Sequence, residues 1–295
     1  MTTKPNSSTL RLGLARVRGA DGGADVVWRR SGSPQAWRAT VNGRGFDDIP
    51  ALLTAADGDP TNIEQGAELY APDEELQSAV GYPRKIVCVG QNYLTHVHEG
   101  GRETASAYPD LFPKWDNALS GPYAEITLPN ESDQIDYESE LAVVIAKRCR
   151  RVPADQADKV IFGYTAANDG SVRDYQFFTT QRLAGKAWDG LTPLGPVIVP
   201  AAELGSSAPD LAITGLLDGN VVQEDRTSNL IYKIPDLVAY ITTIMTLEPG
   251  DVLLTGTPAG VGFVRKPPLL LQDGSVFEVR IEGIGSLRNV YRQEP

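Results

Sequence analysis

Cysteine and histidine are scarce in this chain, which holds two of each among its 295 residues. Cys88 and Cys149 are far apart and form no C-x-x-C pair. Both lie in apolar, strand-like stretches, KIVCVG and VVIAKRCR. The sequence therefore gives no support for a disulfide framework, and we expect two buried, reduced thiols.

The chain also lacks any run of about 18 apolar residues, the length that a membrane helix needs. Its start, MTTKPNSSTLRLG, has no apolar segment after the lysine, so we expect no signal peptide. Basic residues number 27 against 38 acidic ones, and the formal net charge is -11. Nucleic-acid-binding proteins normally carry a basic patch, so we expect no nucleic acid, no membrane and a cytoplasmic location. A metal ion and a few local cations still permit an anionic substrate in one cleft.

Three common catalytic motifs are missing as well. GTPAGVG follows a strand-like segment, but Pro267-Pro268 and LLL come next instead of a helix, which argues against a dinucleotide-binding turn. Lys186 follows Gly185 without a glycine at the P-loop spacing, and no G-x-S-x-G occurs. Neither nucleotide binding nor serine hydrolysis has support in the sequence.

The first part of the chain predicts a small, β-rich N-terminal domain over residues 1–80. Residues 10–17 and 24–30 are typical of short strands, and residues 47–57 of a short helix with an acidic start. The stretch PDEELQSAVGYP then suits a connection. With 41% hydrophobic residues, a chain of this length can build one large domain beside a small one.

Strand patterns recur through residues 81–295, which we expect to form the second and larger domain. They include KIVCVG, ESELAVVIAKR, IFGYTAAND, GPVIVP, LAITGLLDG and DVLLTG. Helical patterns cover only residues 154–161, 171–182 and 234–247, and the last has Pro235 in its first turn and Pro249-Gly250 after its end. Because strands rarely alternate with helices, the pattern predicts a mainly β fold with some α (α+β) rather than a doubly wound sheet.

The segment DYESELAVVIAKR combines carboxylates with an apolar strand. On a strand, Asp136, Glu138 and Glu140 share one face, spaced by about 6.5–7 Å. The sequence turns apolar at once, so this face is expected to run inward, where unpaired charges are strongly unfavourable. A hard divalent cation would compensate them. The plainer alternative is a solvated acidic strand edge with Lys147 and Arg148 nearby.

Asp169 ends a second apolar strand, GYTAAND, just before a helix expected near Ser171. It could cap that helix, or it could be a third oxygen ligand beside the two glutamates. A set of carboxylate oxygens suits Mg²⁺ or Mn²⁺ better than Zn²⁺.

Both histidines lie in the segment GQNYLTHVHEGG. Glu99 follows His96 by three residues, so in a helix the two would share a face and the carboxylate would orient the imidazole. His96 is therefore a candidate general base. The alternative is a surface histidine on a polar loop, and we assign that simpler role to His98.

Five of these segments resemble, in order, the motif blocks of the fumarylacetoacetate hydrolase superfamily. They are KIVCVGQNYLTHVHE, DYESELAVVIAKR, GYTAANDGSVRDYQ, GKAWDGLTPLGPVIV and LEPGDVLLTGTPAGVG, and the resemblance covers roughly residues 83–292. It implies a distorted β-roll core with covering helices, a small variable N-terminal domain and one divalent metal per subunit. It also implies a homodimer.

The resemblance assigns roles to individual residues. It implies metal ligands at Glu138, Glu140 and Asp169, with Mg²⁺ or Mn²⁺ as the ion. It makes His96 with Glu99 a dyad that activates water or moves a proton, and it makes Lys186 the lysine that steadies developing negative charge.

The substrate-binding positions that the resemblance implies are Lys114 near the pocket mouth, Arg173, Gln176, and Thr257 in the turn that binds a substrate carboxylate. Three residues depart from the family pattern around the expected pocket and leave the substrate open: Gln91, Trp115 and Gly170.

The implied activity is that of a metal-dependent enzyme acting on a small anionic 2-oxo acid. If His96 activates water, the reaction is C–C hydrolysis of an acylpyruvate such as fumarylpyruvate, which is our first interpretation. If His96 only moves protons, the reaction is tautomerisation, isomerisation or decarboxylation. A catalytically inactive 2-oxo acid-binding protein is a third hypothesis, and the retained dyad argues against it.

Overall fold

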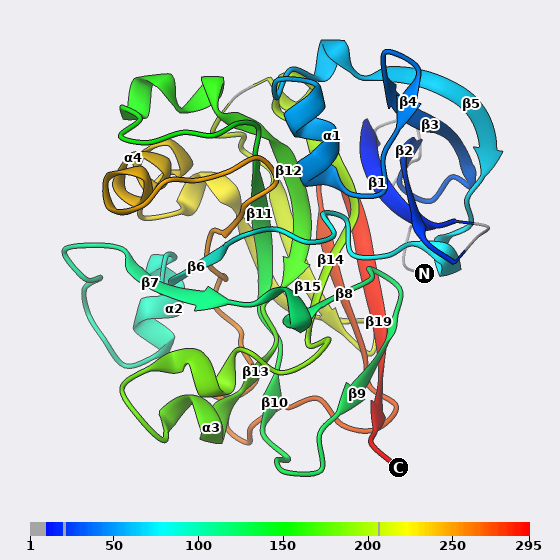
Figure 1. Ribbon diagram of the computed structural model, residues 1–295. Coiled ribbons are helices and arrows are strands. Elements are labelled where there is room, and N and C mark those ends of the chain that lie inside the picture. Colours follow the sequence, from blue (N-terminus) through cyan, green and yellow to red (C-terminus); the bar gives the residue numbers. More distant parts are fainter. Residues whose placement is uncertain (1–9, 20–21, 206) are drawn as a thin grey trace.

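The computed structural model of the protein describes residues 10–19, 22–205 and 207–295, so the predicted N-terminal domain is described without residues 1–9. A 12-stranded sheet runs through this part of the chain in the order β4-β3-β2-β1-β14-β12-β11-β17-β6-β7, with β5 beside β3 and β8 beside β14 (Figure 1). Its strands are β1 (Leu12–Arg18), β2 (Ala24–Arg30), β3 (Gln35–Val41), β4 (Arg44–Gly45), β5 (Glu64–Tyr70), β6 (Ile86–Gly90), β7 (Asp110–Lys114), β8 (Leu119–Ser120), β11 (Ser139–Ile145), β12 (Ile161–Asn168), β14 (Thr192–Pro200) and β17 (Val252–Leu254).

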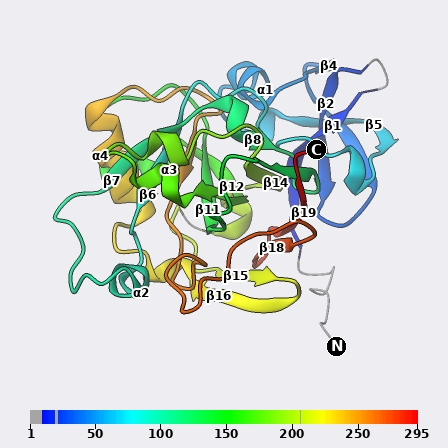
Figure 2. The same ribbon diagram turned by 90° about the horizontal axis from the view of Figure 1, so that it is seen from below.

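A second sheet, with the order β16-β15-β18-β19-β9, packs along one face of β11, β12 and β14 (Figure 2). A two-stranded ladder of β10 and β13 lies near the ends of β11 and β12. The strands of these two sheets are β9 (Glu125–Leu128), β10 (Ile135–Asp136), β13 (Ser171–Val172), β15 (Ala212–Leu217), β16 (Asn220–Arg226), β18 (Val276–Ile281) and β19 (Gly285–Gln293).

Helices are few and short. They are α1 (Ile49–Ala55), α2 (Leu94–Glu99), α3 (Arg173–Phe177) and α4 (Ile234–Ile244), with 3₁₀ turns at Pro60–Asn62, Asp73–Glu75, Asp116–Ala118, Ala154–Lys159, Arg182–Gly185, Ala201–Leu204 and Thr227–Asn229. None of the helices in the described residues has the length and hydropathy of a membrane span.

The predicted fold class is confirmed, since strands dominate and a few helices cover them. The helix predicted over 234–247 is α4, which begins at Ile234 with Pro235 in its first turn. The helix predicted over 171–182 is largely wrong, because residues 171 and 172 pair with β10 and only Arg173–Phe177 is α-helical. The segment predicted over 154–161 is a 3₁₀ turn.

Strand β11 lies at the centre of the molecule and is buried along its whole length. Leu141 and Val143 pack toward the second sheet and α4, whereas Ala142 and Val144 pack toward α1 on the other side. Burial of each large apolar side chain stabilises the fold by about 1.5–3 kcal/mol. The strand is therefore rigidly held, and it carries Glu140 near its start.

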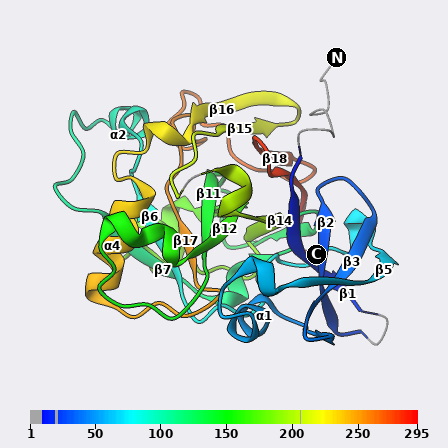
Figure 3. The ribbon, with the colours of Figure 1, turned by 90° about the horizontal axis from the view of Figure 1, so that it is seen from above.

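The N-terminal strands share this core. Strand β1 pairs with β14 where Leu14 lies opposite Ile198, and Leu14 and Trp28 belong to the same hydrophobic cluster as Val144. Figure 3 shows the N-terminal strands, in blue, beside β14 and α1. The boundary between residues 80 and 81 stays a prediction.

Gly163 in β12 is closely packed against β14. We predict that Gly163→Ala destabilises the protein by about 1–3 kcal/mol. An added Cβ would lie 2.1 Å from the carbonyl oxygen of Val199 in β14, so the two strands would have to separate. Gly90→Ala in β6 is the matched control, because there the nearest atom, Asp110 Oδ2, is 3.5 Å away. Chemical unfolding of the three proteins measures the difference, and equal stabilities of both variants would contradict the packing argument.

Candidate active site

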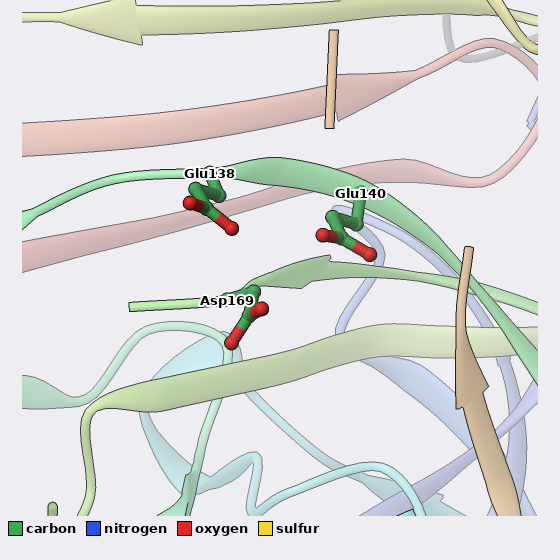
Figure 4. Close-up of side chains that lie close together, drawn as sticks. All are labelled: Glu138, Glu140 and Asp169. Atoms are coloured by element: carbon green, nitrogen blue, oxygen red, sulfur yellow. The ribbon is translucent and has the colours of Figure 1, made fainter. Parts of the chain in front are cut away.

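Glu138, Glu140 and Asp169 converge in one buried cluster (Figure 4). Glu140 lies on β11, Glu138 directly precedes that strand, and Asp169 directly follows β12. The two strands are antiparallel neighbours with Ser139 opposite Asn168, which brings their polar ends together. One oxygen from each carboxylate lies within 4.8 Å of the other two. The three residues predicted as metal ligands are thus side by side.

Backbone contacts fix this convergence. The Asn168 side chain accepts a hydrogen bond from the Glu138 N–H at 2.8 Å, and the Asp169 N–H donates to the Glu138 carbonyl at 2.9 Å. The next position, Gly170, has no room for a side chain, because a Cβ there would lie 2.1 Å from the Leu191 carbonyl oxygen. Asp169 is not a helix cap, since Val172 precedes α3 and the Asp169 side chain faces the cluster.

Three cations surround two of the carboxylates. Lys186 Nζ lies 2.9 Å from Glu138 and 2.7 Å from Asp169, and Lys114 Nζ lies 2.8 Å from the other oxygen of Asp169. Arg173 Nη2 lies 2.7 Å from Glu138. Although burial alone would raise the pKa of Glu138, Lys186 and Arg173 lower that pKa below its ordinary value. Glu138 is therefore held ionised.

Glu140 is different, because no described cation forms an ion pair with it. It accepts a hydrogen bond from the Gly256 N–H at 2.7 Å. Burial, followed by repulsion from Asp169 and Glu138, raises the pKa of Glu140 well above its ordinary value. A buried carboxylate that lies beside two other carboxylates and has no counter-charge of its own among the described residues fits a hard divalent cation as its partner.

Asp136 was expected to share the face of the two glutamates, and it instead holds Arg173. Its Oδ2 lies 2.8 Å from Arg173 Nε and 2.7 Å from Nη2, and its carboxylate also accepts from the N–H groups of Gly262 and Phe263. Arg173 in turn donates to Gln176 at 2.9 Å. Asp136 therefore positions an arginine between itself and Glu138.

The histidine segment forms helix α2, so His96 and Glu99 lie on one helical face as predicted. His96 Nδ1 lies 2.6 Å from Glu99 Oε1, and Glu99 Oε2 accepts from the Gly260 N–H at 2.7 Å. When Nδ1–H donates this hydrogen bond to Glu99, Nε2 is left as the basic nitrogen. His98 is exposed and lies 3.2 Å from the Glu103 carbonyl. The dyad is therefore built into the fold.

A cavity of about 250 Å³ connects these groups. Its wall includes the predicted residues His96, Glu138, Glu140, Arg173, Gln176, Lys186 and Thr257, with Gln91 and the apolar side chains Val89, Phe112, Phe177, Val261, Phe263 and Val264. Trp115 and Gly170, which differ from the family pattern, do not line this cavity. Trp115 instead borders a larger hollow that Trp188 also lines. The lining is mixed, and the Phe112 ring lies beneath the ammonium of Lys186, 5.1 Å from Nζ to the ring centroid.

Lys114 is not at the cavity mouth, where it was expected. Its side chain is fully buried behind Asp169, and Nζ donates to the carbonyls of Lys186 at 2.6 Å and Gly170 at 3.1 Å. This position suits support of Asp169 and Lys186 rather than contact with a substrate.

Sequence reasoning missed three buried amides around the site. Asn168 ends an apolar strand beside Asp169, and that unusual polar pair is a signal that could have found it. Asn92 donates to the Thr255 carbonyl at 2.8 Å and ties the α2 segment to the loop after β17. Gln223 contacts Thr257 from β16. Nothing in the local sequence distinguishes Asn92 or Gln223, because their partners are more than 30 residues away.

Comparison with known proteins identifies the class to which this fold and site belong. The family described as Fumarylacetoacetate (FAA) hydrolase C-terminal matches residues 85–292. The chain therefore belongs to the fumarylacetoacetate hydrolase superfamily, as the five sequence segments indicated.

Individual relatives differ in activity. The human mitochondrial oxaloacetate tautomerase FAHD2A is 40% identical over 209 residues, which cover 70% of this chain and 66% of the human protein. The structure of a 5-carboxymethyl-2-hydroxymuconate delta-isomerase from Mycobacterium smegmatis is 32% identical, covers 96% of this chain and 100% of its own, and superposes with a TM-score of 0.74. A fumarylpyruvate hydrolase from Pseudomonas aeruginosa, in complex with Mn²⁺ and pyruvate, is 30% identical, with 72% and 91% coverage and a TM-score of 0.65.

We predict that Glu140→Gln has opposite effects on two properties: it raises the stability of the metal-free protein and abolishes stabilisation by the metal. A carboxyl whose pKa is raised on folding destabilises the folded state at pH values above its unfolded pKa of about 4.3. At pH 7 without divalent metal, the variant should therefore be more stable than the wild type. Added Mn²⁺ should raise the unfolding temperature of the wild type and leave that of the variant unchanged.

Thermal unfolding with and without Mn²⁺ measures both effects, and the exposed Glu74→Gln is the control that should behave as the wild type. A variant that is still stabilised by Mn²⁺ as strongly as the wild type would contradict the assignment of Glu140 to the metal.

Proposed function

We propose that this protein is a metal-dependent enzyme that moves a proton at the carbon next to the 2-oxo group of a small anionic 2-oxo acid, with oxaloacetate as its first candidate substrate. One observation carries the proposal. An imidazole oriented by Glu99 and two carboxylates of the buried cluster, those of Glu138 and Glu140, line the same cavity of about 250 Å³. A base therefore lies beside the place where the substrate oxygens would bind.

Glu138, Glu140 and Asp169 would hold the divalent ion, Mg²⁺ or Mn²⁺ by the chemistry of their oxygens. When bound, this ion supplies Lewis-acid stabilisation of negative charge on the 2-oxo oxygen. The ammonium of Lys186 is held at the same wall by Glu138 and Asp169, which together raise its pKa although burial alone would lower it. Lys186 thus stays charged next to the reacting oxygen.

The proton transfer can be written with groups of this chain. His96 Nε2 removes a proton from the carbon next to the carbonyl, and the C–H electron pair becomes the carbon–carbon double bond. The carbonyl oxygen takes up the negative charge beside Lys186 and then a proton from solvent, which gives the enol. His96 releases its proton, and the reverse sequence returns the keto acid. Glu99 steadies the imidazolium in both directions.

The choice of oxaloacetate is supported by similarity and by charge. A relative at 40% identity is described as an oxaloacetate tautomerase. Lys186, Arg173 and Arg182 line the cavity together with Glu138 and Glu140, so with a divalent ion bound the lining groups carry a net positive charge that suits a compact anionic acid. A cavity of about 250 Å³ also suits a small substrate better than one with a long tail.

Carbon–carbon hydrolysis of an acylpyruvate, our first interpretation from sequence, is the second candidate. The same dyad could activate water, and the Pseudomonas relative is a fumarylpyruvate hydrolase. Decarboxylation and binding without turnover remain hypotheses. The homodimer, the cytoplasmic location and the absence of nucleic-acid and membrane partners likewise stay predictions, and the human relative is described as mitochondrial.

We predict that His96→Ala lowers kcat/KM for oxaloacetate enol–keto exchange by about 10²–10⁴-fold, because general-base catalysis contributes on that order. Glu99→Gln should cause a smaller loss, since the imidazole remains but loses its charged partner. The exposed His98→Asn is the matched control and should keep wild-type activity. Exchange is followed by ultraviolet absorbance with Mg²⁺ present, and an active His96→Ala enzyme would contradict the assigned base.

A substrate panel decides between the two candidate reactions. Enzyme loaded with Mg²⁺ or Mn²⁺ is mixed with oxaloacetate and with several acylpyruvates, and NMR identifies the products. We expect accelerated enol–keto exchange of oxaloacetate without chain cleavage. Release of pyruvate and an acid from an acylpyruvate would favour the hydrolase instead, and release of CO₂ the decarboxylase.

A further inference from the structure

Gln223 lies on β16 but its side chain reaches into the active-site wall. The residue is 1% exposed. Its Oε1 accepts a hydrogen bond from the Ser139 N–H at 2.9 Å, and its Nε2 donates to the Pro258 carbonyl and to Thr257 Oγ1, each at 2.8 Å. Ser139 lies between Glu138 and Glu140 in the chain, so the amide joins the carboxylate strand to the loop that carries Thr257.

The orientation of this amide is fixed by its partners. The Ser139 N–H can only donate, so it must face the amide oxygen, and the Pro258 carbonyl can only accept, so it must face the NH₂ group. The second hydrogen of Nε2 then points at Thr257 Oγ1. A flipped amide would place two acceptors together at Pro258 and two donors together at Ser139.

This orientation determines what the Thr257 hydroxyl can do. Because Thr257 Oγ1 accepts from Gln223, its own hydrogen is left for another acceptor. Among the described residues, no side chain or backbone group accepts that hydrogen, and Thr257 is part of the cavity wall. The hydroxyl therefore offers the cavity a hydrogen-bond donor.

The surroundings hold both groups in place. Gly215 lies opposite Gln223 in the β15–β16 pair, and a Cβ there would lie 3.1 Å from Gln223 Oε1 and 2.4 Å from Ser139 Oγ. On the other side, Gly256, next to Thr257, donates its N–H to Glu140. The donor is thus fixed relative to the carboxylate cluster.

We propose that Gln223 is a positioning residue which turns the Thr257 hydroxyl into an obligatory donor, and so selects ligands that present a carboxylate oxygen at that wall. The proposal rests on the proposed function only in taking a 2-oxo acid as the ligand. A donor already committed to the cavity requires no rearrangement when the anion enters, which favours affinity.

A double-mutant cycle tests the coupling. Gln223→Met removes the amide, Thr257→Val removes the hydroxyl, and Thr257→Ser keeps it. The affinity of Mg²⁺-loaded protein for oxalate, a dianion that resembles the enolate of a 2-oxo acid, is measured by calorimetry. KM and kcat for oxaloacetate are measured in parallel, and thermal unfolding shows which variants fold.

We expect Gln223→Met to weaken oxalate binding by roughly tenfold to a hundredfold, as for loss of a hydrogen bond to a charged group. Thr257→Val should weaken it similarly, Thr257→Ser should bind nearly as the wild type, and adding Gln223→Met to Thr257→Val should change it little. The effect should fall mainly on KM. If Gln223→Met weakens oxalate binding by the same factor in the wild-type protein and in the Thr257→Val background, the proposal is overturned.

Gly215→Ala provides a second route if Gln223→Met does not fold, because it displaces the amide without removing it. A loss of oxalate affinity that disappears in the Thr257→Val background supports the proposal, and a loss that persists contradicts it. A wild type that binds oxalate but fails to convert oxaloacetate would leave this inference standing and defeat the proposed reaction. A wild type that does not bind oxalate would overturn the inference.

Discussion

The structure depends on the burial of three carboxylates at the ends of two central strands. Lys186, Lys114 and Arg173 form ion pairs with Glu138 and Asp169, whereas no cation in the described part of the chain pairs with Glu140. Such a cluster is unfavourable in a packed core unless a further positive charge joins it. The excess of buried negative charge, which is unfavourable by itself, is what makes the cluster suitable for a divalent ion.

The scaffold explains how this imbalance is tolerated. Strand β11 is buried along its length, so its backbone cannot move Glu140 away from its neighbours. The Glu138 N–H donates to the Asn168 side chain, the Gly256 N–H donates to the Glu140 carboxylate, and Asp136 fixes Arg173. The loop after β17 forms hydrogen bonds with Glu99 through Gly260 and with Gln223 through Thr257. Its Gly256 N–H also donates to Glu140, so this one loop connects the His96–Glu99 dyad and the Thr257 hydroxyl to the carboxylate cluster.

The sequence alone predicted the parts of the site that depend on local pattern. Alternation along a strand brought Glu138 and Glu140 together, and the three-residue spacing paired His96 with Glu99. Family resemblance added Lys186, which no local rule predicts. The orphaned Glu140 and the Gln223 contact could not be foreseen, because they depend on strand pairings between distant segments. The family resemblance also implied that Lys114 lies near the pocket mouth, whereas the structure shows its side chain buried against Asp169.

The most direct test of this account is anomalous X-ray scattering from crystals of the protein grown with Mn²⁺. The account predicts one manganese peak per chain, bonded to oxygens of Glu138, Glu140 and Asp169. A map without manganese at these three residues, with the ion elsewhere or absent at saturating concentration, would contradict the central claim that the buried cluster is a metal site.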